Sequence, residues 1–188
     1  MTTQTLLTEW LDKRLHGILL CLYTGVRIGE LLGLTWSDVD FDRGVIKITK
    51  TVYREKDDNG AWNLCVDTPK TKASDRVIPL PEYITEMLHQ DLASALSPYV
   101  VENKKGDRMS IRSYQYMFEK LTESAGVRKL NFHALRHTFA TRAIECGMDI
   151  KTVADIMGHK NASITLNRYA HCMLDHKMDM MQKLPRIL

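Results

Sequence analysis

The chain has 188 residues and a formal net charge of +3, with 44% hydrophobic and 26% charged residues. This composition is typical of a globular protein, and the length allows one compact domain with its own core. No apolar run approaches the length of a membrane span, and the first ten residues lack the pattern of a secretory signal. We therefore expect a cytoplasmic protein with a single domain over 1–188.

The four cysteines lie far apart and form no CxxC pair, so we expect buried, reduced thiols rather than disulfides. One string, from His171 to His176, could suggest a metal site. No second ligand pair flanks it at zinc-site spacing, so we expect no metal and no other cofactor. The cysteines are Cys21, Cys65, Cys146 and Cys172.

The first half of the chain predicts two helices and then a small antiparallel sheet. Apolar residues recur at three-to-four spacing over 5–23, Gly25 interrupts the pattern, and a short helix is expected over 27–33. Three segments that follow are rich in β-branched residues, and their links are too short for a crossover helix. The expected strands are 44–53, 61–68 and 76–80.

The second half predicts helices separated by glycines and one exposed, irregular loop over 97–109. The fold class is therefore α+β and mostly helical, with a small three-stranded antiparallel sheet inserted after the second helix. The Met-rich tail 172–188 could form a short helix that binds a groove. The expected helices are 82–96, 110–125, 134–146, 149–157 and 162–170.

Six residues spread along the chain could together act on a phosphodiester without a metal. Arginine binds the growing phosphate charge, and histidine moves protons near neutral pH. A lysine can protonate the leaving oxygen, and a tyrosine can attack if positive surroundings help it lose its proton. The candidates are Arg27, Lys70, His133, Arg136, His159 and Tyr169, with Glu30 one helical turn beyond Arg27 to hold Arg27 or a neighbouring histidine.

Each candidate taken alone has an ordinary structural explanation. An Arg-x-x-Glu pair is usually a surface helix pair, a histidine after Gly158 can belong to a capping turn, and Tyr169 could be core. Either Lys70 or Lys72 could be an exposed hairpin lysine, and the sequence leaves the choice between them open. The joint occurrence of the candidates, in this order, favours a functional explanation.

The spacing of His133 and Arg136 places both on one face of a helix, with Phe132, Leu135 and Phe139 on the opposite, buried side. His137 is expected to point elsewhere and to be structural. The stretch 103–136 carries eight Lys/Arg against three acids. Such a stretch is either a solvated surface or a site for a phosphate backbone.

Several strings resemble the catalytic domain of tyrosine recombinases, the phage-integrase family, and most of all integrases of phages and conjugative transposons of Gram-positive bacteria. They are YTGVRIGELLGLTWSDVDF, TPKTKASDRVIPL, FHALRHTFATRAIECG and VADIMGHKNASITLNRYAH. The resemblance covers nearly the whole chain, and it implies the fold class given above.

The resemblance also implies a site-specific recombinase that cuts and rejoins DNA through a 3′-phosphotyrosyl intermediate without metal or ATP. It assigns a role to each candidate. Arg27 and Arg136 would bind the scissile phosphate, Lys70 would protonate the leaving 5′-hydroxyl, His133 would assist proton transfer, His159 would bind a phosphate oxygen, Tyr169 would be the nucleophile, and Glu30 would support the site.

The partners implied are double-stranded DNA, three further copies in a tetramer on that DNA, and accessory DNA-bending or directionality proteins. The isolated domain would be a monomer, the tail 172–188 would dock on a neighbouring subunit, and a separate N-terminal DNA-binding domain is expected outside this chain. Alternatives remain open: chromosome-dimer resolution, inversion or supercoil relaxation, a DNA-binding module without catalysis, or a helical interaction protein.

Overall fold

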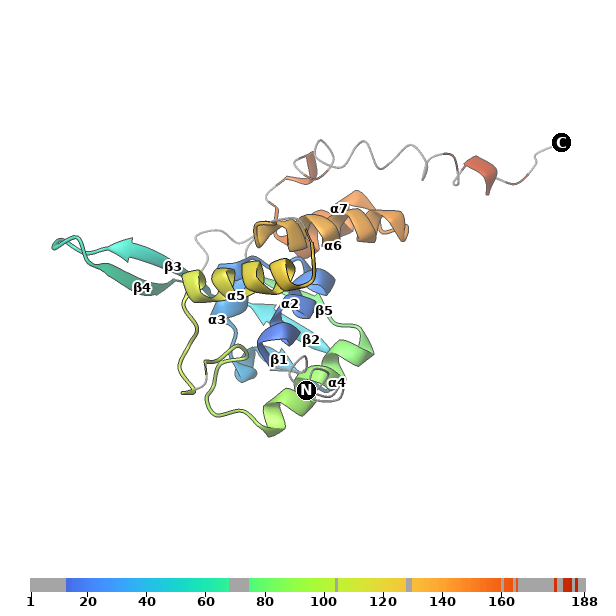
Figure 1. Ribbon diagram of the computed structural model, residues 1–188. Coiled ribbons are helices and arrows are strands. Elements are labelled where there is room, and N and C mark those ends of the chain that lie inside the picture. Colours follow the sequence, from blue (N-terminus) through green and yellow to red (C-terminus); the bar gives the residue numbers. More distant parts are fainter. Residues whose placement is uncertain are drawn as a thin grey trace.

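The computed structural model is mostly helical with a small antiparallel sheet, which confirms the expected α+β class (Figure 1). The predicted helix over 162–170 and the tail lie largely outside the described residues. Those described are 13–67, 75–103, 105–127, 130–159, 161–163, 165, 178, 181–183 and 185.

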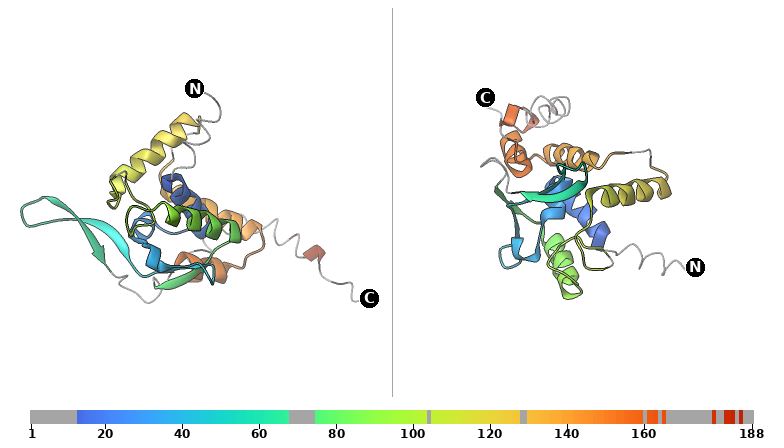
Figure 2. Two further views of the ribbon diagram at one scale, coloured as in Figure 1. Left: turned by 90° about the horizontal axis from the view of Figure 1, so that it is seen from below. Right: turned by 90° about the vertical axis from the view of Figure 1, so that its left-hand side faces the viewer.

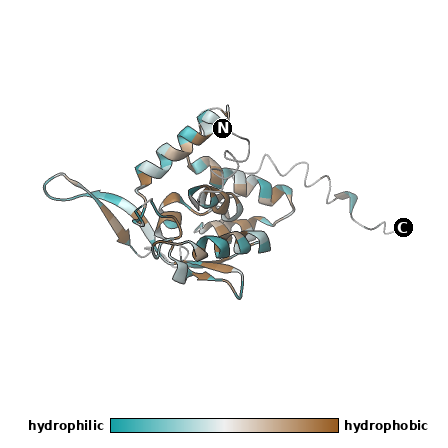
Figure 3. Ribbon diagram, turned by 60° about the horizontal axis from the view of Figure 1, so that its bottom comes forward, coloured by the Kyte–Doolittle hydropathy of each residue, from teal (hydrophilic) through white to brown (hydrophobic). Residues whose placement is uncertain are grey.

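Helix α2 (Lys13–Thr24) is the central element, and its sequence periodicity accounts for its position. Leu20 and Cys21 are fully buried, where α2 packs on α6 (His133–Glu145). On its other side α2 contacts α4 (Glu82–Ala93), and the His16 Nδ1 atom lies 2.9 and 2.8 Å from the two carboxylate oxygens of Asp91. Figure 3 shows apolar residues concentrated where these central helices and the sheet meet.

A three-stranded antiparallel sheet is present, but its members differ from those expected. It contains β1 (Val39–Asp40), β2 (Val45–Ile48) and β5 (Arg76–Pro79), in the order β1-β2-β5. Strands β3 (Thr51–Lys56) and β4 (Trp62–Asp67) pair with each other in a separate hairpin that projects from the body of the molecule (Figures 1 and 2). The prediction of one continuous strand over 44–53 is therefore wrong.

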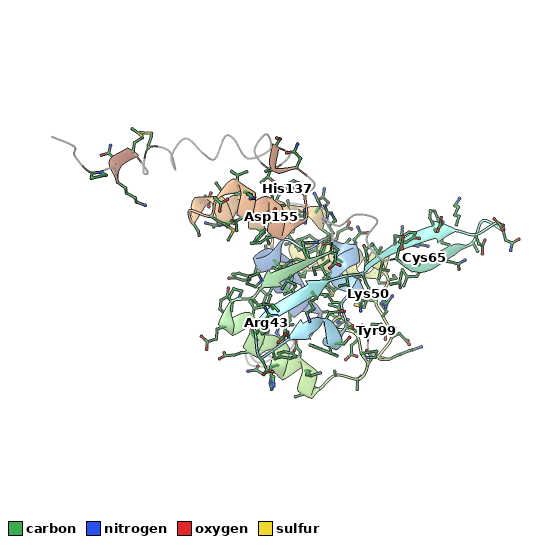
Figure 4. All side chains as sticks on the ribbon, turned by 180° about the vertical axis from the view of Figure 1, so that it is seen from behind. Arg43, Lys50, Cys65, Tyr99, His137 and Asp155 are labelled. Atoms are coloured by element: carbon green, nitrogen blue, oxygen red, sulfur yellow. The ribbon has the colours of Figure 1, made fainter. Side chains whose placement is uncertain are left out.

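The strand breaks where helix α3 (Ile28–Gly33) packs against it. A Cβ atom at Gly29 would collide with the carbonyl of Val52, and one at Gly33 would lie 3.2 Å from the carbonyl oxygen of Lys50. The Lys50 ammonium, labelled in Figure 4, bonds Asp38 at 2.7 Å in the short 3-10 turn Trp36–Asp38. These contacts turn the chain out of the sheet at Lys50.

The second half follows the predicted helices, with α5 (Ile111–Ser124) and α7 (Ile150–Met157) beginning at polar caps. The Ser110 hydroxyl accepts from the backbone of Ser113, and the Asp149 carboxylate accepts from that of Thr152. The loop 97–109 is irregular, as expected, but it is not exposed throughout. Its Val100 and Val101 are 2% and 1% exposed, because the segment pairs with the end of α3 through a Val100–Leu34 backbone bond.

The described cysteines are free, but they are not uniformly buried. Cys21 is buried, and burial raises the pKa of its thiol. Cys65 is half-buried on the hairpin and Cys146 is exposed, so the expectation of buried thiols is wrong for Cys146.

Among the helices described here, none has the length and apolar character needed to cross a membrane.

Candidate active site

Arg27 occupies the N-cap of α3, as the sequence predicts, directly after a turn at Gly25 with φ of 63°. Its backbone N–H donates to Glu30 Oε2 at 2.8 Å, and its Nη1 donates to Glu30 Oε1 at 2.9 Å. Of the two partners that the sequence allows for Glu30, Arg27 or a neighbouring histidine, the structure thus pairs Glu30 with Arg27. The Arg27 side chain remains 41% exposed, so its guanidinium is accessible to a ligand while Nη1 is held by Glu30.

The Glu30 carboxylate is buried and has a second cationic partner that the sequence reasoning missed. Arg76, at the start of β5, donates Nη1 to Oε1 at 3.0 Å and Nη2 to Oε2 at 2.9 Å, which is a two-pronged contact. The alternation of residues along the strand could have indicated that Arg76 is buried. Arg76 and Ile78 lie two residues apart on one strand, so the face that buries Ile78 also buries Arg76.

These contacts decide the ionisation of Glu30. Burial alone would raise its pKa, but the hydrogen bonds and charge of Arg76, followed by those of Arg27, outweigh burial. The pKa of Glu30 therefore lies below its ordinary value, and the carboxylate is ionised at neutral pH. The trio of Glu30, Arg27 and Arg76 carries one net positive charge.

Arg136 is 2% exposed, although the sequence placed it opposite the buried side of its helix. That expectation is wrong, because α6 is enclosed on more than one side: Leu135 and Phe139 are buried as well. The Arg136 Nη1 donates to the Gly25 carbonyl at 2.5 Å, and Nη2 donates to the Met157 carbonyl at 2.6 Å. Arg136 thus connects α6 to the turn before Arg27 and to the end of α7.

Helix α7 ends in a glycine turn that positions His159. Gly158 adopts the left-handed conformation (φ 65°, ψ 45°), and the His159 N–H closes back on the Ala154 carbonyl at 2.9 Å. The last carbonyls of a helix have no hydrogen-bond donor within the helix, and they carry partial negative charge. A cationic side chain near them supplies the missing donor and interacts favourably with that charge. Here Arg76 Nε bonds the Ile156 carbonyl at 2.6 Å, one residue before the Met157 carbonyl that Arg136 binds.

The ring of His159 is oriented by a residue that the sequence reasoning did not identify. His159 Nδ1 lies 2.6 Å from the hydroxyl of Thr165, whose side chain is fully buried. A hydrogen bond at one ring nitrogen fixes the direction in which the other nitrogen points. We therefore expect the imidazole to have one preferred orientation.

His133 is exposed at the first residue of α6, one turn before Arg136. Its ring lies against that of His137 with centroids 4.7 Å apart and an edge-to-face angle of 89°. The expectation that His137 points elsewhere is wrong, because residues four apart share one helical face. His137, labelled in Figure 4, thus supports the imidazole of His133.

The structure brings together Arg27, Glu30, Arg136 and His159 through a continuous set of contacts that runs from α3 to the end of α7. Lys70, Lys72 and Tyr169 lie outside the described residues, as do His171 and His176. Among the residues the structure does describe, no group of three His, Cys, Asp or Glu side chains could hold a metal ion. The assembled groups can bind an anion and move a proton beside it.

Solved structures with the same fold are tyrosine recombinase catalytic domains. An integrase of transposon Tn1549, in complex with a circular intermediate DNA, is 30% identical, with a TM-score of 0.77 over 93% of this chain and 59% of that one. A XerA recombinase is 29% identical, with a TM-score of 0.68 over 93% of this chain and 60% of that one.

The chain belongs to the phage integrase family, whose model matches residues 4–176. A XerC-like tyrosine recombinase of Caldanaerobacter subterraneus is 33% identical over 88% of this chain and 47% of its own length. The transposase of transposon Tn916 from Enterococcus faecalis is 31% identical over 92% of this chain and 46% of its own length. The chain therefore spans about half the length of these curated relatives.

Proposed function

We propose that the chain is the catalytic part of a site-specific DNA recombinase that cuts and rejoins DNA strands through a 3′-phosphotyrosyl intermediate, in integration or excision of a mobile element. The observation that carries the proposal is the pair of bonds from Arg136 to the carbonyls of Gly25 and Met157. They draw three separate parts of the chain together, and each part presents one group suited to a phosphate.

In the proposed mechanism Arg27 and Arg136 stabilise the charge that spreads over the scissile phosphate in its five-coordinate transition state. His159 donates a hydrogen bond to a phosphate oxygen, and His133 assists proton transfer. Tyr169 attacks the phosphorus as its phenol proton passes to His133, the bond to the 5′-oxygen breaks, and Lys70 protonates that oxygen. Lys72 remains the alternative proton donor, because both lysines lie in the same connection before β5.

The proposed substrate is double-stranded DNA, as in the complex of the Tn1549 integrase. Part of the basic stretch supports this substrate, because Lys105 and Arg112 are exposed to solvent, where a phosphate backbone could reach them. Arg108 lies 4.5 Å from the ring centre of Tyr99, labelled in Figure 4, and so packs on the protein. A DNA substrate also implies a cytoplasmic protein.

Recombination requires several active sites on one DNA complex, and we propose a tetramer in which the tail of one copy docks on the next. A mostly apolar groove of about 540 Å³ lies between α2 and α6, lined by Leu19, Leu22, Tyr23, Phe139 and Met148 among others. Met178 and Met181 of the tail are 61% and 65% exposed, so they are available to such a groove.

The test is covalent trapping on a nicked recombination site, using the protein at its natural full length. A nick lets a short fragment diffuse away after cleavage, so the protein–DNA adduct accumulates. The wild type should form the adduct, whereas Tyr169→Phe should form none and bind DNA with nearly unchanged affinity, because it loses only the attacking oxygen.

Adduct in the Tyr169→Phe variant would mean that another residue is the nucleophile. DNA binding by the wild type with no adduct on any nicked site would favour a binding module without catalysis. Integration, excision and resolution share this chemistry, and sequencing the products on the element's own ends distinguishes them.

A further inference from the structure

Arg76 is buried behind the candidate site, with 7% of its side chain exposed, and no role in the proposed reaction has been assigned to it. Its guanidinium uses three nitrogens. Two bind the Glu30 carboxylate at 3.0 and 2.9 Å, and Nε binds the Ile156 carbonyl at 2.6 Å. Arg76 therefore touches the residue that holds Arg27 and the helix end that leads into His159.

The charges around Glu30 explain how Arg76 could affect the reaction. Each of the two Glu30 carboxylate oxygens accepts one hydrogen bond from Arg27 and one from Arg76. Without Arg76 the buried Glu30 carboxylate would have the charge of Arg27 to balance it, because an unbalanced buried charge is costly. The positive charge of Arg27 would then be neutralised within the protein instead of being offered to a phosphate.

We infer that Arg76 is a positioning residue for DNA cleavage, which rests on the proposed function: its charge balances Glu30 so that the charge of Arg27 remains available to the scissile phosphate. The bond from Nε to the Ile156 carbonyl fixes the Arg76 guanidinium in place and connects it to helix α7. Arg76 does not touch the substrate, and it acts through Arg27.

The test compares single-turnover adduct formation on nicked DNA between the wild type and three variants of the protein at its natural full length. Arg76→Met should slow cleavage by roughly 100-fold, the loss expected from misplacing a reacting group, with DNA affinity within about threefold of wild type. Adding Glu30→Gln to Arg76→Met removes the unbalanced carboxylate and should restore at least about tenfold of that rate. Arg43→Met, an exposed arginine in the turn after β1, is the matched control and should leave the rate unchanged.

A merely structural role predicts something different, because a second buried change would not help a damaged fold. If Arg76→Met cleaves within threefold of wild type, or if the double variant is no faster than Arg76→Met, the inference is overturned. Should Arg76→Met fail to fold, Arg76→Lys decides: it keeps the charge, so a rate within tenfold of wild type supports the inference and a larger loss in a folded protein contradicts it. Absence of adduct in the wild type would overturn the proposed function itself, which is a separate result.

Discussion

The carboxylate of Glu30 links the geometry of the site to the stability of the fold. Because its pKa is lowered in the folded protein, the ionised form stabilises the native state. That contribution is fully present above the ordinary glutamate pKa of about 4.3, and it is lost as the pH falls through the lower folded value. Acid should therefore destabilise the protein partly through Glu30.

We predict that the free energy of unfolding of the wild type falls more steeply between pH 5 and pH 3 than that of Glu30→Gln, as measured by urea denaturation. Asp38→Asn is the comparison. The pKa of Asp38 is also lowered, with burial opposing and a hydrogen bond from Lys50 favouring its ionised form, but Asp38 is less buried, so the change of slope should be smaller. Equal slopes for wild type and Glu30→Gln would contradict the assignment.

Among the elements, the turn between α2 and α3 contributes both to the stability of the fold and to the position of the site residues. Gly25 has a φ of 63°, and a Cβ atom there would lie 2.5 Å from Cδ1 of the Phe139 ring. The same residue supplies the carbonyl that Arg136 binds. The turn is thus constrained on both sides, and it fixes where Arg27 begins α3.

We predict that Gly25→Ala destabilises the protein by about 2–4 kcal/mol, because it adds overpacking against Phe139 to the cost of a positive φ. Gly60→Ala is the matched control: its φ is 79°, and nothing lies within 4 Å of an added Cβ, so we expect about 1–2 kcal/mol. Thermal or urea unfolding measures both. Equal losses would show that Phe139 does not restrict the turn.

Helix α5 could be predicted from the sequence because it buries residues at helical spacing on one face, whereas α6 is buried on more than one side and was bounded by the glycine after it. The boundary between β2 and β3 could not, because two glycines of α3 set it by packing on Lys50 and Val52. For the site, the pairing of Arg27 with Glu30 was local and therefore predictable. The burial of Arg136 was not, since its partners are carbonyls 111 and 21 residues away.

For the whole molecule, the proposed docking of one copy's tail in another copy's groove makes recombination depend on assembly. We predict that deleting 173–188 leaves DNA binding within about threefold of wild type but lowers recombination by at least about tenfold, because each lost docking contact weakens the tetramer. Gel-shift and recombination assays on the same DNA separate the two effects. Unchanged recombination by the truncated protein would remove the docking role of the tail.

If Arg27 and Arg136 act on one phosphate, as proposed, then neutralising that phosphate should remove the need for both. Replacing a non-bridging oxygen of the scissile phosphate with a methyl group removes the negative charge that an arginine would stabilise. On normal DNA, Arg27→Ala and Arg136→Ala should each slow cleavage by about 100-fold or more. On the neutral DNA we expect both penalties to shrink at least tenfold, whereas penalties of the same size on both substrates would mean that the two arginines do not act on that phosphate.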